Sequence, residues 1–231
     1  MILPTMRTQA FAALTLAVAL CSAALPMQAA QLRLTVLNTD GKPAADVVVQ
    51  AIPTAAWNPQ PLPEPTVILQ QNIRFVPFVT VVPVGATVRF INKDKFDHHV
   101  RSQPGGPLGN VAPAKQFEFR MAAAREGRDS PPADLKLDTA GIVALGCHLH
   151  GSMRGHLLIS TTPWYGVTDD KGQVSLANLP DGQVELKLWH PDQLSDQAST
   201  QVQAAGNVNT QAQLNFSPKP RNIVIRPTRE Y

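Results

Sequence analysis

Short runs of apolar and β-branched residues, each ending at Gly, Pro, Asn or Asp, recur along this chain and constrain its fold more than any other feature. Residues 31–37 alternate between apolar and polar side chains, a glycine turn follows, and residues 46–52 form a second run, which predicts a pair of strands. Seven or eight similar runs lie between residues 66 and 160, enough for a β-sandwich. The 21 prolines favour the same turn-rich architecture over helices. We therefore expect an all-β protein, with residues 121–133 compatible with either one helical turn or a loop.

Prolines also divide the chain. Five of them lie between residues 53 and 65, a stretch that cannot join a sheet interior and therefore predicts an extended linker at a domain boundary. After Pro163 the pattern changes to turn, strand, turn and strand. The turns at residues 39–43 and 168–172 are locally alike, which suggests that the two ends of the chain belong together.

Those two turns, with a Val-rich strand and the Leu-Pro-x-Gly turn at residues 179–182, resemble the carboxypeptidase regulatory-like family of transthyretin-like sandwiches. The resemblance implies a discontinuous sandwich made of residues 31–55 and 163–216. Residues 66–162 are then expected to form an inserted second sandwich, and residues 217–231 a C-terminal tail. The alternative is that both ends extend one larger sandwich.

The first 30 residues have the pattern of a signal peptide. Arg7 is followed by an apolar run over residues 11–27 and then by the small residues Ala29 and Ala30. The run is interrupted by polar residues and by Pro26, and it is shorter than the roughly 20 residues of a membrane span. We expect export to the periplasm, cleavage near Ala29 or Ala30, and no membrane span.

Charge and motif content argue against several classes of function. Lys and Arg number 20 and Asp and Glu 17, and a net charge of +3 is too weak for a nucleic-acid-binding face. The sequence has no Gly-x-Ser-x-Gly element, no His-Glu-x-x-His helix and no phosphate-binding loop. We therefore expect neither an enzyme nor a nucleic-acid partner.

Once the leader is removed, Cys147 is the one remaining cysteine, in a compartment where an unpaired thiol is a liability. It begins the motif Cys147-x-x-His150-x-x-Met153, on an expected loop between two strands. A thiolate, an imidazole and a thioether, joined by a second imidazole from elsewhere, form the ligand set of a blue copper centre. An inert buried thiol, a packed methionine and a surface histidine are the structural alternative, but they do not explain why the sole mature cysteine lies in this motif.

The histidines are clustered. All six lie beyond the leader, and five occupy two short segments: His98 and His99 in one, and His148, His150 and His156 in the other. His148 is expected to be exposed, with a secondary metal contact as its second interpretation. The sixth, His190, is expected to pack at a strand end. Two carboxylates precede the first pair, Asp94 and Asp97, and either orient an imidazole or are simply solvated.

Residues 66–162 resemble the cupredoxin family, in particular its amicyanin, pseudoazurin and plastocyanin branch. The resemblance lies in Phe75-Val-Pro77, in the run from Val82 to Asn92, in His98-x-Val100 and in Cys147-His-Leu-His-Gly-Ser-Met153. It implies a Greek-key β-sandwich that holds one type 1 copper through His98, Cys147, His150 and Met153. In the family the first ligand lies six residues after the Asn and two before the Val, which favours His98, with His99 as the alternative. The Gly-Ser before Met153 departs from the bulkier residues common in that loop.

With its flanking sandwich, the whole chain resembles exported cupredoxin-like proteins of the type labelled methylamine utilisation proteins. The resemblance implies a periplasmic one-electron carrier whose partner is a redox protein such as a dehydrogenase or a c-type cytochrome, with His150 conducting the electron. A periplasmic copper store, sensor or delivery protein, using His99, His148 and His156 as extra ligands, is the alternative. An envelope adhesion or scaffold module is the third hypothesis. Zinc accepts similar nitrogen and sulfur ligands and is the alternative metal.

Overall fold

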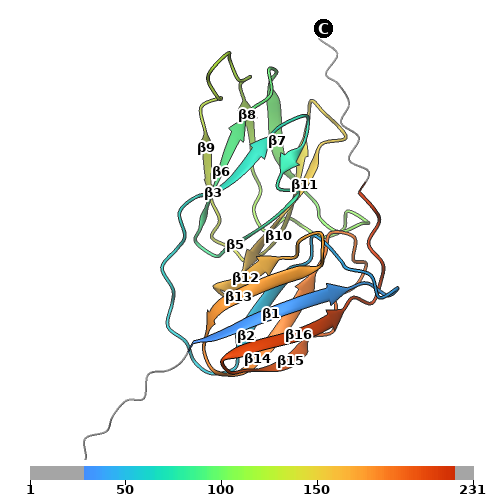
Figure 1. Cartoon of the computed structure of the whole chain (residues 1–231). Coiled ribbons are helices and arrows are strands. Elements are labelled where there is room, and N and C mark those ends of the chain that lie inside the picture. Colours follow the sequence, from blue (N-terminus) through green and yellow to red (C-terminus); the bar gives the residue numbers. More distant parts are fainter. Residues whose placement is uncertain (1–28, 222–231) are drawn as a thin grey trace, which may run out of the picture.

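The computed structural model describes residues 29–221, and within that range the regular elements are all β-strands (Figure 1). Sixteen strands form four sheets, which confirms the predicted all-β class. Of the two structures that residues 121–133 allowed, the loop is correct: a strand ends at Met121, and an irregular segment with a tight turn near Arg125 leads to the next strand. In the described part of the chain, no helix is long and apolar enough to cross a membrane.

One pair of sheets contains the strands nearest the two ends of the chain. Its first sheet has the order β13-β1-β16, and its second the order β12-β2-β14-β15. Along β1, alternate apolar side chains such as Leu32 and Leu34 are buried, as a strand with one face on a core requires. Each such burial contributes roughly 1.5–3 kcal/mol. The strands of this pair are β1 (Ala30–Leu37), β2 (Val48–Pro53), β12 (Trp164–Val167), β13 (Gln173–Leu179), β14 (Gly182–Trp189), β15 (Thr200–Ala204) and β16 (Asn207–Gln213).

The other pair of sheets is formed by the middle of the chain. A five-stranded sheet of order β5-β11-β10-β7-β8 faces a four-stranded sheet of order β4-β3-β6-β9. Phe90 of β6 and Leu145 of β10 are buried in the core of this sandwich. The strands are β3 (Thr66–Gln70), β4 (Phe75–Val76), β5 (Val79–Pro83), β6 (Thr87–Asn92), β7 (His98–Gln103), β8 (Glu118–Met121), β9 (Ala133–Lys136), β10 (Gly141–Cys147) and β11 (Arg154–Ser160).

The two sandwiches lie one above the other in Figure 1 and meet at a small apolar contact. Val48 and Trp189 of the first sandwich pack there with Val79 and Leu158 of the second. The chain crosses between them through the proline-rich stretch after β2 and again just before β12. Pro53, which the sequence placed in the linker, is instead the last residue of β2 and lies opposite Val184. The division into two folding domains stays a prediction.

Both predicted terminal segments extend beyond the described residues. The predicted signal peptide lies almost wholly outside them, and β1 begins at Ala30, which is fully buried and pairs with Leu179. The first residues of the predicted tail lie against the rest of the protein. The backbone N–H of Lys219 donates to Asp192 at 3.0 Å, and the guanidinium of Arg221 lies 4.3 Å from the ring centre of Phe78.

Candidate metal centre

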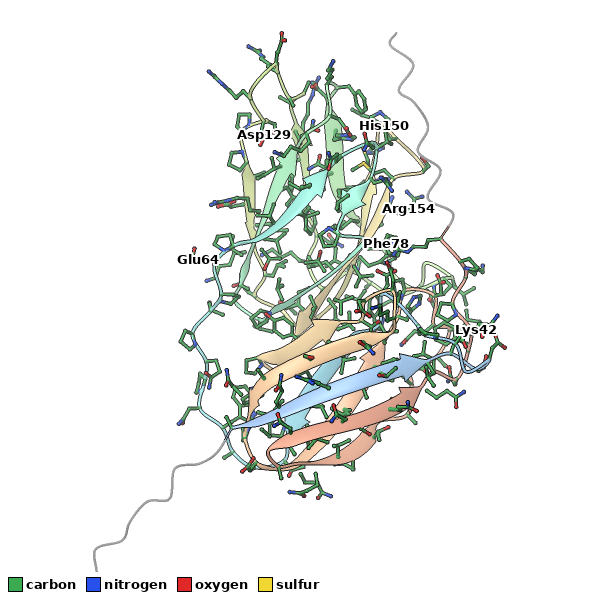
Figure 2. The ribbon with its side chains drawn as sticks, viewed as in Figure 1. Lys42, Glu64, Phe78, Asp129, His150 and Arg154 are labelled. Carbon is green, nitrogen blue, oxygen red and sulfur yellow. The ribbon has the colours of Figure 1, made fainter. Side chains whose placement is uncertain are left out.

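The candidate centre lies where β7 begins and β10 ends. These strands are antiparallel neighbours, and their register places Cys147 opposite Val100. Their pairing therefore brings His98 and Cys147 to the same end of the sheet. The chain then turns back through the exposed residues Gly151 and Ser152, and the backbone N–H of Met153 donates to the carbonyl of His150 at 2.9 Å. Figure 2 shows His150 at the end of this sandwich that is remote from the other one.

Three of the predicted ligands meet around the sulfur of Cys147. Its Sγ lies 3.5 Å from Nδ1 of His98 and 3.6 Å from Nδ1 of His150. One donor atom from each residue lies within 4.8 Å of those of the other two. A sulfur at about 2.3 Å and a nitrogen at about 2.0 Å from one tetrahedrally coordinated ion are about 3.5 Å apart. The separations therefore fit a single first-row metal ion.

The fourth predicted ligand, Met153, lies in the same apolar region. It is fully buried and belongs with Cys147 to the core cluster of the second sandwich. It closes the turn that follows His150 and lies directly before β11. The structure thus keeps the three members of the motif together, while coordination by the thioether stays a prediction.

The orientation of His98 is determined by Asp94. Nε2 of the fully buried His98 lies 2.9 Å from a carboxylate oxygen of Asp94. The carboxylate also accepts hydrogen bonds from the backbone N–H groups of Asn72, at 2.6 Å, and Ile73, at 3.0 Å. An Nε2–H that donates to Asp94 leaves the lone pair on Nδ1, which is the nitrogen facing Cys147.

The charge of Asp94 is maintained by these contacts. Burial by itself raises the pKa of the Asp94 carboxyl, but the hydrogen bonds from His98, Ile73 and Asn72 outweigh burial and hold that pKa below its usual 3.8. Asp94 is therefore an anion at neutral pH, and an anion on the far nitrogen makes an imidazole a better ligand. Of the two roles that the sequence allowed for Asp94, orientation of an imidazole is the one the structure has. Asp97 instead pairs with Arg120.

His150 is the more exposed of the two imidazoles that face the sulfur. It packs against Phe96, whose ring centre is 5.1 Å away, and against His98 at 4.8 Å. Partial burial, helped by the neighbouring His98, lowers the pKa of His150 below its usual 6.5. The neutral ring with a free lone pair, which is the form that binds a metal, is therefore favoured at neutral pH.

The sulfur of Cys147 has one further polar neighbour. Cys147 is almost completely buried, and the backbone N–H of His99 points at its Sγ at 3.4 Å. Such a donor stabilises negative charge on the sulfur. The side chain of His99 lies on the opposite face of β7, as strand alternation requires, and binds Glu118 instead. The structure therefore brings His98, and not His99, to Cys147.

The side chains of the remaining histidines belong to other groups. His148 is exposed and near Glu118, as part of the group that contains His99. His156 packs between Phe78 and Trp189, and His190 packs against Phe216. Phe96 and Glu118 were not predicted from the sequence. For Glu118 the reason is that the register that sets it diagonally across from His99 is not encoded by any local pattern.

No family model matches this sequence, and no curated protein matches it. Similar solved structures include a copper-containing nitrite reductase from Thermus scotoductus SA-01, at 20% identity and a TM-score of 0.36, covering 47% of this chain and 25% of that one. A novel purple cupredoxin from Nitrosopumilus maritimus has 19% identity and a TM-score of 0.34, covering 41% of this chain and 99% of that one. An oxidised mutant of amicyanin has 22% identity and a TM-score of 0.30, covering 42% of this chain and 82% of that one. The present chain thus spans only a quarter of the reductase, and each likeness is confined to less than half of the present chain.

Proposed function

We propose that this protein binds one type 1 copper through His98, Cys147, His150 and Met153 and carries single electrons in the periplasm. The proposal rests on one observation: the buried Sγ of Cys147 lies 3.5 Å and 3.6 Å from the Nδ1 atoms of His98 and His150. A thiolate with two imidazoles and a nearby thioether is the donor set of blue copper sites. The same geometry supports a bound metal more than it supports an inert core cysteine.

Bound copper would supply a one-electron change between Cu(I) and Cu(II). The protein residues have to keep the ligands still while the charge changes. Asp94 holds the ring of His98, the pairing of β7 with β10 holds Cys147, and the turn closed by Met153 N–H and His150 C=O holds the loop. A ligand set held in this way needs little rearrangement between the two charge states, which suits an electron carrier.

The exposed edge of the centre is the proposed exit for the electron. His150 is only partly buried, and the neighbouring Leu149 is 57% exposed. An imidazole at the surface beside an apolar side chain suits brief contact with another redox protein, such as a dehydrogenase or a c-type cytochrome. The proposed role is transfer of electrons to or from that partner, without chemistry on a substrate of its own.

A copper store or delivery protein is the second candidate. The observation that favours it is the exposed group of His99, Glu118 and His148, which offers a metal further ligands outside the buried centre. Storage requires several coppers for each chain and no fast electron exchange. The two candidates therefore differ most clearly in electrochemistry.

The test is to load the purified mature chain with Cu(II). We expect an intense blue band from thiolate-to-copper charge transfer and a reversible one-electron reduction. Cys147→Ser should abolish the band, whereas His190→Asn, which replaces a histidine of the other sandwich, should leave it unchanged. A pale complex in the native protein, or a band that survives Cys147→Ser, would refute the type 1 site.

A further inference from the structure

A second group of metal-binding side chains lies on the outer face of the same strands. It consists of His99 on β7, Glu118 on β8 and His148 directly after β10. One carboxylate oxygen of Glu118 is 2.9 Å from Nε2 of His99 and 3.7 Å from Nδ1 of His148. His99 is one third exposed, and Glu118 and His148 are slightly more than half exposed, at 33%, 52% and 53%. A hydrated ion therefore has direct access to all three donors.

The strand arrangement produces this group. Consecutive residues of a strand point to opposite faces, so His98 and Cys147 point inward while His99 and His148 point outward. The backbone N–H of His148 donates to the carbonyl of His99 at 2.9 Å, which extends the pairing of β10 with β7 past Cys147. Because β8 is the next strand in the sheet, Glu118 lies beside this outward pair.

An ordinary ion pair does not account for the arrangement. An ion pair with histidine requires one imidazole for each carboxylate, but here one oxygen of Glu118 faces two imidazoles. The rings of His99 and His148 are stacked, with their centres 5.5 Å apart and their planes inclined at 28°. Two imidazoles that face the same carboxylate oxygen can share a cation with it. The neighbouring Arg120, which lies opposite His99, is engaged by Asp97 and does not compete for Glu118.

We propose that His99, Glu118 and His148 form a second, solvent-open site for a borderline divalent ion, Zn²⁺ or Cu²⁺. Two imidazoles and one carboxylate are a known zinc donor set that leaves the fourth position to water. Ca²⁺ and Mg²⁺ prefer shells of oxygen ligands, so the two imidazoles select against them. None of the three residues is a ligand of the buried centre, so the site does not depend on the proposed electron-carrier function.

The experiment is a Zn²⁺ titration by calorimetry, with bound metal counted after dialysis, on the metal-free mature chain. We expect two equivalents in the native protein and one in Glu118→Gln, because that variant keeps the fold but loses a ligand. His148→Asn should have the same effect. Glu126→Gln, which changes another exposed carboxylate, on the loop after β8, should still bind two equivalents.

The buried centre is removed in a second arm. In a Cys147→Ala background we expect the outer site to bind one Zn²⁺, and Glu118→Gln in that background to weaken binding at least about tenfold. Circular dichroism of each variant establishes that it is folded. Should Cys147→Ala fail to fold, the native pair of Glu118→Gln and Glu126→Gln decides the question. Equal stoichiometry and affinity in that pair would overturn the proposal, whether or not the protein turns blue with copper.

Discussion

The carboxylate of Asp94 connects a metal-facing imidazole to the backbone of a separate loop. It accepts one hydrogen bond from His98 and two from the N–H groups of residues 72 and 73, next to β4. Asn92, which is fully buried, holds the turn that carries Asp94, since its Oδ1 accepts the N–H of Asp94 at 2.8 Å. The orientation of His98 therefore depends on residues that do not touch the metal.

Asp94→Asn should weaken copper binding without unfolding the protein. The single amide oxygen can still accept one of the two backbone N–H groups that now bind separate carboxylate oxygens, but the anion on Nε2 of His98 is lost. We expect the Cu(II) affinity to fall about 10- to 100-fold and the free energy of unfolding of the metal-free protein to fall by about 1–3 kcal/mol. Competition with a chelator and urea unfolding measure the two effects. Asp97→Asn, at a carboxylate that pairs with Arg120, is the matched control, and an equal loss of affinity in both variants would contradict this role for Asp94.

At the scale of elements, the loop that carries His150 and Met153 depends on close packing at the start of β11. Gly155 lies two residues after Met153 in the chain and opposite Leu145 of β10. A Cβ added at Gly155 would lie 2.9 Å from Cβ of Phe75 and 3.2 Å from its ring. The turn itself is open, because a Cβ added at Gly151 meets no atom within 4 Å.

These two glycines form a matched pair of substitutions. Gly155→Ala should lower the free energy of unfolding by about 1–3 kcal/mol, because the backbone or Phe75 must move to make room. Gly151→Ala should change it by less than about 0.5 kcal/mol. The midpoints of urea unfolding, compared at equal slope, measure both values. If Gly151→Ala were the more destabilising, the packing described at Gly155 would be wrong.

The strand pattern predicted the elements better than their partners. The runs near residues 87–92, 98–103 and 141–147 were recognisable as strands because β-branched residues and alternation are local properties. Which strands pair with each other was not recognisable from the sequence. For example, β5 pairs with β11 and β3 pairs with β6, both in parallel and between segments that are not consecutive in the chain. Pairing of this kind depends on how the faces pack, which no local run encodes.

At the scale of the whole molecule, the half-buried His156 lies where the two sandwiches meet. His156 packs against Phe78 at 5.0 Å, and Trp189 of the other sandwich lies 6.1 Å away. Burial, more than any charge, lowers the pKa of His156 to about 4, and it also lowers the pKa of His190 to about 4. Both rings are therefore neutral in the folded protein at neutral pH.

This burial predicts a loss of stability in mild acid. Unfolded histidines bind protons below about pH 6.5, while the folded ones resist until about pH 4. The unfolded state therefore binds more protons between those values, and the free energy of unfolding should fall as the pH drops from about 6.5 to 4, with full stability above 6.5. Urea unfolding of the metal-free protein at pH 7.5 and pH 5 measures the difference. His156→Gln should reduce the pH dependence. A pH dependence unaltered by His156→Gln would contradict the prediction.

The sequence by itself determined the all-β class and the close spacing of Cys147, His150 and Met153, because both depend on the order of neighbouring residues. The spacing of the first ligand in the family that the sequence resembles favoured His98 over His99. Only the tertiary structure decided that His98 faces Cys147 with Asp94 behind it, and that Glu118 joins His99 to His148 on the outer face. The physical reason is that packing of the whole core sets the register between strands that are remote in the chain. The same packing determines which of two adjacent side chains points inward.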